Sequence, residues 1–169
     1  MERPRYRIAL EKEDFKFSAA HFTLFPDRDA ELLHGHNYRV RVELAGSHLD
    51  DLGLLVDLDA AKRKIRALCA ALDSRMLLPE SGSQLQVETQ EGGVEVRWRD
   101  RRYVFPVEDV LILPMVNISI ELLAEYLWRA LAEEFRSGGV GAAIGAVEEL
   151  EVGVEETAGQ KCVRWGRVG

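Results

Sequence analysis

The sequence predicts an α+β fold, and two kinds of periodicity indicate this class. Several segments alternate apolar and polar residues, as strands with one buried face do, and two longer segments repeat apolar residues at helical spacing. The predicted order is two strands, a helix, an inserted β-hairpin or three-stranded flap, a second helix and two final strands. An antiparallel four-stranded sheet with both helices on one face accommodates that order. With 169 residues, 47% of them hydrophobic, the chain is expected to form one domain over 1–169.

Composition limits the partners that the protein is expected to bind. The net charge of −7 argues against nucleic acid and against an anionic membrane. The first residues, 1–5, lack the apolar stretch of a signal peptide, and no apolar run is long enough to span a membrane. The two cysteines, Cys69 and Cys162, are predicted to be reduced thiols, which favours a cytoplasmic location.

The chain begins with two strand-like segments whose apolar phases differ. In the first segment, over residues 5–11, the apolar face carries Tyr6, Ile8 and Leu10. In the second segment, the common face carries Phe15, Phe17, Ala19 and His21. Because the phase moves from even to odd positions, we expect a bulge or bend around residues 11–14.

A third strand-like segment, residues 36–44, begins at a pair of histidines. Its apolar face carries Tyr38, Val40, Val42 and Leu44. His34 and His36 have the same parity as this set, so a strand extended backwards directs both rings toward the buried side. His21 is in phase on the preceding strand. Two antiparallel strands would therefore carry three imidazoles toward one interior point.

Three inward-facing imidazoles indicate a metal site. One alternative is that each histidine is an ordinary core residue with a satisfied ring, but burying three rings without a shared ligand would leave polar nitrogens unpaired. Three neutral imidazoles with an open fourth position are the ligand set of a catalytic zinc ion. His48 follows Gly46 and Ser47 in a polar turn, and we expect it to be exposed and not to bind metal.

Residues 57–73 predict the first helix. Asp57 is a suitable N-cap, and the apolar stripe consists of Leu58, Ala61, Ile65, Leu68, Cys69 and Leu72. Asp73 lies at the C-terminus, where the helix dipole disfavours a carboxylate. This position is explained either by a function of Asp73 or by ordinary solvation of a helix end.

The second helix is predicted to begin near Asn117 or Ser119 and to end at Gly138-Gly139. Glu121 suits the positive first turn. The core positions are Ile120, Leu123, Ala124, Leu127, Leu131 and Phe135.

The insert between the helices, about 79–110, contains three short strand-like runs with turns. Its basic cluster, residues 97–103, could bind phosphate or nucleic acid, but a charged hairpin turn fits the acidic chain better. In the strand that follows the second helix, Glu156 continues the apolar face of Leu150, Val152 and Val154, whereas Glu155 faces outward. Residues 162–168 could pair with this strand.

Two motifs carry a family resemblance. Residues 17–21 (FSAAH) and 34–38 (HGHNY) closely resemble the 6-pyruvoyl-tetrahydropterin synthase / 6-carboxytetrahydropterin synthase family. Weaker matches cover nearly all of the chain outside the insert, at Gly53–Leu58, Leu72-Asp73, Ser119–Glu121 and Glu155–Thr157. The resemblance implies the tunnelling fold, in which subunits join their sheets into a barrel with active sites at subunit interfaces. It therefore implies a homo-oligomer, often a hexamer.

The resemblance also implies a function, that of a zinc-dependent lyase acting on 7,8-dihydroneopterin triphosphate, a small-molecule pterin. Zn²⁺ on His21, His34 and His36 would bind oxygens of the substrate side chain and acidify the adjacent bonds. Glu156 matches the carboxylate that binds the guanidine-like edge of the pterin. Ser119 lies where the family has a pterin-contacting threonine.

The chain departs from the family pattern at two positions. Residues 24–33 contain no cysteine, and Ala30, at the common cysteine position, is followed by Glu31. A branch of the family uses glutamate in this neighbourhood and gives 6-hydroxymethyl-7,8-dihydropterin, a folate precursor. The family's Asp-His pair is Asp73-Ser74 here, and serine cannot carry a proton as imidazole does.

Glu31 is therefore the expected general base, with Asp73 as a second catalytic residue. Two alternatives remain open. One is synthesis of 6-carboxy-5,6,7,8-tetrahydropterin for deazapurine (queuosine) biosynthesis, which the missing cysteine disfavours. The other is a pterin-binding paralogue with impaired catalysis, which the missing cysteine and Ser74 favour.

Overall fold

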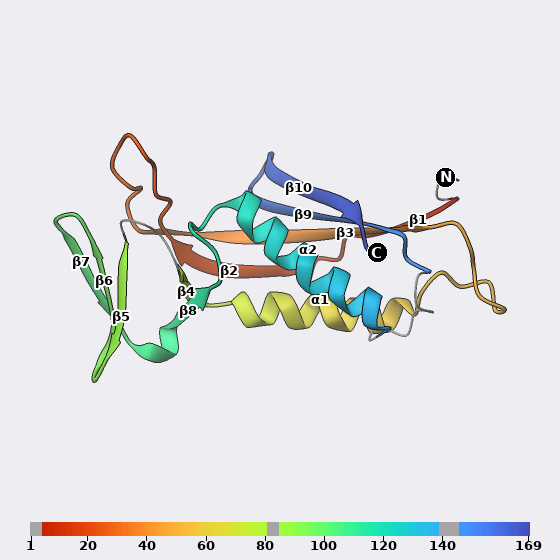
Figure 1. Cartoon of the computed structure of the whole chain (residues 1–169), viewed down its shortest axis with the longest axis horizontal. Helices are drawn as coiled ribbons and strands as arrows, with labels where there is room; N and C mark the ends of the chain where they lie inside the picture. The colour runs from red at the N-terminus through yellow and green to blue at the C-terminus, as the bar shows by residue number, and fades with distance from the viewer. Residues whose placement is uncertain (1–4, 81–84, 139–145) are drawn as a thin grey trace.

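The long central strand of the sheet is β3 (His34–Gly46), and the other elements are arranged around it. The structure is a computed structural model that describes residues 5–80, 85–138 and 146–169. Its seven-stranded sheet has the order β10-β9-β3-β2-β4-β8, and β1 also pairs with β3. Two helices and a separate three-stranded sheet complete the fold (Figure 1), which confirms the predicted α+β class.

Strands β1 (Tyr6–Leu10) and β2 (Lys16–His21) pair with successive parts of β3 along the same edge. The ladder of β1 ends at Leu10 and that of β2 begins at Lys16. Between them the chain turns, and the Phe15 carbonyl accepts a hydrogen bond from the backbone N–H of Val40 at 2.8 Å. The predicted bend at residues 11–14 is thus confirmed, and it moves the apolar phase onto Phe15.

The predicted sheet of four antiparallel strands was too small. Strands β4 (Arg75–Pro79) and β8 (Val110–Leu113) extend it, and both pairings, β2 with β4 and β4 with β8, are parallel. Residues 76–79 of β4 are all buried, so no alternation of polar and apolar residues marks this strand. Strands covered on both faces appear in a sequence as continuous apolar runs, and such short runs do not distinguish strand from helix.

Helix α1 (Leu58–Leu72) agrees with its prediction, and the Asp57 side chain caps it by accepting bonds from the N–H groups of Asp59 and Ala60. Helix α2 (Ile120–Ser137) begins after the N-cap Ser119, which is one of the two starting positions that the sequence predicted. It ends at Gly138, whose φ of 75° is the left-handed conformation that glycine adopts most readily. Gly139, the other predicted terminator, lies outside the described residues.

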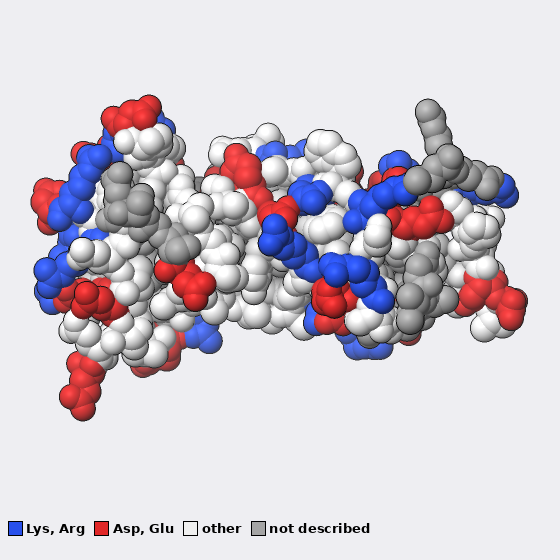
Figure 2. Space-filling model, viewed as in Figure 1, with Lys and Arg blue, Asp and Glu red and all other residues white. Residues whose placement is uncertain are grey.

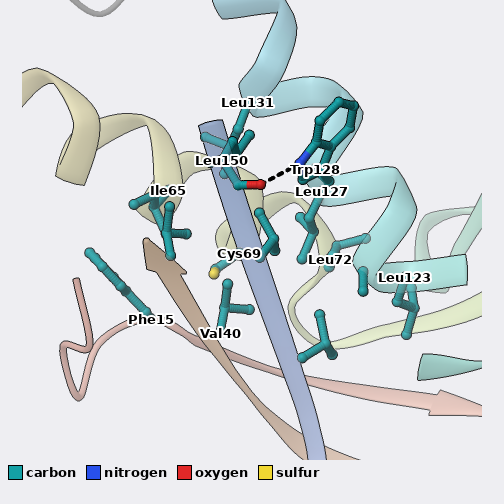
Figure 3. Packing of buried hydrophobic residues seen from close by; sticks show 14 of the residues in the cluster. Phe15, Val40, Ile65, Cys69, Leu72, Leu123, Leu127, Trp128, Leu131 and Leu150 are labelled. Carbon is teal, nitrogen blue, oxygen red and sulfur yellow. Dashed lines mark hydrogen bonds between the residues drawn. The ribbon is translucent and has the colours of Figure 1, made fainter. Parts of the chain in front are cut away.

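Both helices pack on one face of the sheet, where they form the main core with β2, β3 and β9 (Glu149–Thr157). Figure 3 shows leucines of α2 and Ile65, Cys69 and Leu72 of α1 converging on Val40. The indole N–H of Trp128 donates to the carbonyl of Leu150 at 2.9 Å, which ties α2 to β9. This packing gives the strands that carry the histidines a rigid support.

The two cysteines are free, as predicted. Burial raises the pKa of Cys69 to about 12, with Asp14 and Asp73 adding to the effect, so this thiol stays protonated in the core. Cys162 is half-buried in the last strand, β10 (Gln160–Arg167), which pairs with β9.

The insert forms a second sheet from β5 (Gln86–Gln90), β6 (Gly93–Trp98) and β7 (Arg101–Phe105). A short 3-10 helix, η1 (Val107–Asp109), then leads back into β8. The predicted flap is therefore confirmed, although residues 81–84 lie outside the described ranges. In the basic cluster, Arg97 and Arg102 both bind Glu95, which agrees with a charged hairpin.

Neither helix within the described ranges combines the length and the apolar character needed to cross a membrane.

Candidate active site

The register of β2 and β3 brings three histidines together. His21 pairs with His34, and Ala19 pairs with His36, so all three rings leave the sheet on the side that the helices cover. The ring centroids of His21 and His36 are 5.4 Å apart, and those of the other two pairs are 4.7 Å apart. One ligand nitrogen from each ring lies within 4.8 Å of the others, which is close enough for the three to hold one metal ion. The inward parity of these residues was predicted correctly.

The state of the rings fits a zinc ion. His21 is 1% exposed, and both of its ring nitrogens are buried, with Nε2 facing the Glu156 carboxylate at 3.2 Å. Burial lowers the pKa of His21 and outweighs the opposite effect of Glu156, so the ring is neutral and has a free lone pair. His34 Nδ1 donates to the Leu32 carbonyl at 2.7 Å, which leaves its Nε2 free to bind metal. Three imidazoles form a donor set that zinc prefers.

A carboxylate from β9 faces the same point. Glu156 Oε1 lies 3.2 Å from His21 Nε2 and 3.6 Å from His36 Nε2, and the Tyr38 hydroxyl donates to it at 3.1 Å. Burial and then the Glu156 charge raise the pKa of Tyr38, so its phenol remains a donor. Glu155 accepts a hydrogen bond from the N–H of Gly159 at 2.8 Å and has no contact with the histidines among the described residues. The predicted choice of Glu156 as the inward carboxylate is thus confirmed.

A second carboxylate approaches from the loop between β2 and β3. Glu31 Oε2 lies 4.0 Å from His34 Nε2 and accepts a bond from the Thr23 N–H at 3.1 Å. The Glu31 N–H donates in return to the Thr23 carbonyl at 3.0 Å. Burial by itself raises the pKa of Glu31, but the bonds from Thr23 and the nearby His34 and His21 outweigh it and lower the pKa. The carboxylate is therefore ionised at neutral pH and can accept a proton.

Asn117 and Thr23 contribute to the site without having been predicted to do so. The Asn117 amide bonds both the N–H and the carbonyl of Leu24, at 3.0 and 2.9 Å, and the Thr23 hydroxyl donates to the Ile118 carbonyl at 3.2 Å. These bonds tie the residues after His21 to the start of α2. No spacing in the sequence signals them, because they join side chains to backbone groups about 95 residues away.

Ser119 has a structural contact of its own. Its hydroxyl accepts a bond from the Leu122 N–H at 3.4 Å, as an N-cap does. Ser119 is half-buried and follows Ile118, whose carbonyl binds Thr23. Contact between Ser119 and a pterin remains a prediction.

Within the described residues of one chain, Asp73 makes no contact with the three histidines. Its Oδ1 accepts a bond from the Ser18 N–H at 2.6 Å, and its Oδ2 accepts one from the Ser74 hydroxyl at 3.2 Å. Because Ser18 alternates with Ala19 along β2, its side chain emerges on the face opposite His21. The unfavourable position of Asp73 at the end of α1 is thus offset by a bond to the edge of β2. His48 is exposed, as predicted.

The fold and the site define a class: an α+β protein with a cluster of three histidines that could hold a metal ion and with two carboxylates close to these histidines. Comparison with known proteins identifies the family within this class. The model of the 6-pyruvoyl tetrahydropterin synthase family matches residues 9–167, and the chain belongs to that family.

Relatives and solved structures agree with this assignment. A Methanocaldococcus jannaschii protein, provisionally named 6-carboxy-5,6,7,8-tetrahydropterin synthase, is 28% identical over 145 residues, which are 86% of each chain. The 6-pyruvoyl tetrahydropterin synthase of Plasmodium vivax is 28% identical, with a TM-score of 0.87 over 96% of this chain and 98% of that one. The Plasmodium falciparum protein of the same name is 27% identical, with a TM-score of 0.88 over 98% and 99%. Two further P. vivax structures are variants in which a glutamate, described as a catalytic residue, is replaced by alanine or cysteine.

Proposed function

We propose that this protein is a zinc-dependent lyase that acts on the side chain of 7,8-dihydroneopterin triphosphate and gives 6-hydroxymethyl-7,8-dihydropterin. The observation that carries the proposal is the Glu31 carboxylate, 4.0 Å from His34 Nε2 in a loop that contains no cysteine. The P. vivax synthase, in which a glutamate is described as catalytic, supports a carboxylate as base. Like other members of the family that it resembles, the protein would act as a cytoplasmic homo-oligomer.

In this proposal, His21, His34 and His36 hold the zinc ion. When bound, zinc polarises the oxygens of the substrate side chain and thereby acidifies the adjacent C–H and O–H bonds. Glu31 accepts the proton that is released. Its lowered pKa keeps it ionised, and the Thr23 N–H fixes one of its oxygens.

Glu156 is proposed to bind the pterin ring. Paired N–H donors on the pterin match a carboxylate in a bidentate arrangement. Glu156 is only 12% exposed and has one oxygen directed at the histidines, so a ring bound there would have its side chain near the metal. Ser119 is proposed to contact the pterin. Asp73 is proposed to act in catalysis at the site of a neighbouring subunit, because within one chain its two carboxylate oxygens bond Ser18 and Ser74.

A second candidate function is synthesis of 6-carboxy-5,6,7,8-tetrahydropterin, which the M. jannaschii relative favours. Incubating the zinc-loaded protein with 7,8-dihydroneopterin triphosphate and separating the products by chromatography distinguishes the candidates. We expect 6-hydroxymethyl-7,8-dihydropterin. Formation of 6-carboxytetrahydropterin would select the second function, and the absence of any product would indicate a pterin-binding paralogue.

A further inference from the structure

The loop that carries Glu31, residues 22–33, leaves β2 after His21 and returns to β3 at His34. It contains no helix or strand, and within it the backbones of Thr23 and Glu31 are bonded to each other. A loop of this length has many conformations open to it, so the position of its carboxylate depends on contacts with the rest of the chain.

The three-stranded sheet supplies such contacts to the loop. Arg101, the first residue of β7, donates from Nη1 to the carbonyls of Ala30 and Glu31, at 3.1 and 2.9 Å. Arg99, in the preceding turn, binds the Asp29 carboxylate at 2.5 Å. Three consecutive loop residues are thus held by arginines of the insert. In Figure 1 the loop and strands β5–β7 lie at the same end of the molecule, and Figure 2 shows basic and acidic side chains intermingled there.

Apolar packing joins the same two parts. Phe22, the residue after His21, is 3% exposed and stacks on Tyr103 of β7 with ring centroids 5.7 Å apart. Ala30 is 5% exposed and belongs to the same cluster. The other members of this cluster, which is separate from the main core, come from β4 and the insert: Met76, Leu78, Leu85, Val94, Val96 and Trp98. The insert therefore packs against the loop near both ends.

We propose that the three-stranded sheet holds the Glu31 loop in its active position and that Arg101 is the positioning residue. The inference rests on the proposed function, because it concerns the group proposed there as the base. Arg101 bonds the backbone of Glu31 itself, and the side chain of Glu31 is fixed by Thr23, so a shift of this backbone moves the carboxylate away from His34. A base acts only when it is held within a fraction of an ångström of its productive position.

The test compares Arg101→Met with Arg102→Met. The two arginines are neighbours on β7, but Arg102 points to the other face, is 60% exposed and binds Glu95 within the insert. Loss of a charged hydrogen bond makes local opening easier. We expect Arg101→Met to speed hydrogen exchange at the Glu31 and Thr23 amides by about tenfold or more. Amides of β6 should be unchanged, and Arg102→Met should leave the loop as in the parent protein.

The kinetic part of the test separates positioning from folding. In Arg101→Met, kcat for the dihydropterin substrate should fall by about tenfold or more, with KM and zinc content nearly unchanged. Arg101→Lys, whose ammonium can still donate to the carbonyls, should recover part of both effects. If hydrogen exchange in β6 also rises in Arg101→Met, the Arg101→Lys variant decides between positioning and folding. A return of the loop amides toward the parent exchange rate supports the positioning role of Arg101, and no return contradicts it.

The outcomes also separate this inference from the proposed function. If the parent protein has no turnover, the lyase proposal fails, while the exchange experiment still tests whether Arg101 positions the Glu31 loop. If the parent protein turns over the substrate and Arg101→Met matches Arg102→Met in both hydrogen exchange and kcat, the positioning role of Arg101 is wrong. The lyase proposal is then unaffected.

Discussion

Replacing Glu31 by glutamine removes a base while preserving its shape and its local bonds. The Thr23 N–H, 3.1 Å from Glu31 Oε2, can donate equally well to an amide oxygen, and the backbone bonds of Glu31 are not altered. The variant therefore loses the ability to take up a proton beside His34 and little else. A positioned base typically contributes about 10²–10⁴-fold, so we expect kcat to fall by that factor. Zinc content and pterin affinity should stay close to those of the parent protein.

The assay is steady-state turnover of 7,8-dihydroneopterin triphosphate, with products measured by chromatography and zinc by elemental analysis. Asp73→Asn is the matched control, because it also converts a carboxylate to an amide and keeps an oxygen to accept the Ser18 N–H. It should lose less activity than Glu31→Gln, since the imidazole that the family resemblance implies beside this aspartate is replaced here by Ser74. Unchanged turnover in Glu31→Gln would show that the base is another group.

Three further predictions test the proposed metal ligands, the proposed binding of the pterin by Glu156, and the insert. His36→Ala should lose zinc and His48→Ala should retain it, as elemental analysis would report; the reverse pattern would refute the ligand assignment. Glu156→Gln should weaken pterin binding in a calorimetric titration by roughly 1.5–3 kcal/mol or more, whereas Glu155→Gln should have little effect. Hydrogen bonds from two arginines lower the pKa of Glu95 from its ordinary 4.5, so its contribution to stability is present above that pH and is lost as the pH falls through the lowered value. Acid unfolding of the β5–β7 sheet, followed by hydrogen exchange, should therefore depend less on pH in Glu95→Gln.

Periodicity predicted the parts of this protein in which one face of an element is buried. Phe17, Ala19 and His21 are buried because they face the helices. The alternation along β3 predicted correctly that His34 and His36 lie on the same side of the sheet. The inward direction of the Glu156 side chain was predicted in the same way, because Glu156 continues the face of Val152 and Val154.

The remaining parts depend on contacts that leave no periodic trace. Strands β4 and β8 are short and pair with each other in parallel, β4 inside the sheet and β8 at its edge. Both consist mainly of consecutive apolar residues, so no alternation marks them as strands. Asn117 and Arg101 act on backbone carbonyls and N–H groups of a distant loop, and such groups are the same for every residue type. Asp73 was recognised as unusual, but its bond to the Ser18 N–H becomes visible only when α1 is placed against the edge of β2.

Turnover of 7,8-dihydroneopterin triphosphate, measured while zinc is added to metal-free protein, tests the central claim most directly. If the three histidines form the catalytic metal site, activity should rise in proportion to added zinc and reach a plateau at one ion per chain, and His36→Ala should show no such rise. Activity that is already complete in the metal-free protein, or a fully zinc-loaded protein that turns over no dihydropterin, would contradict the account.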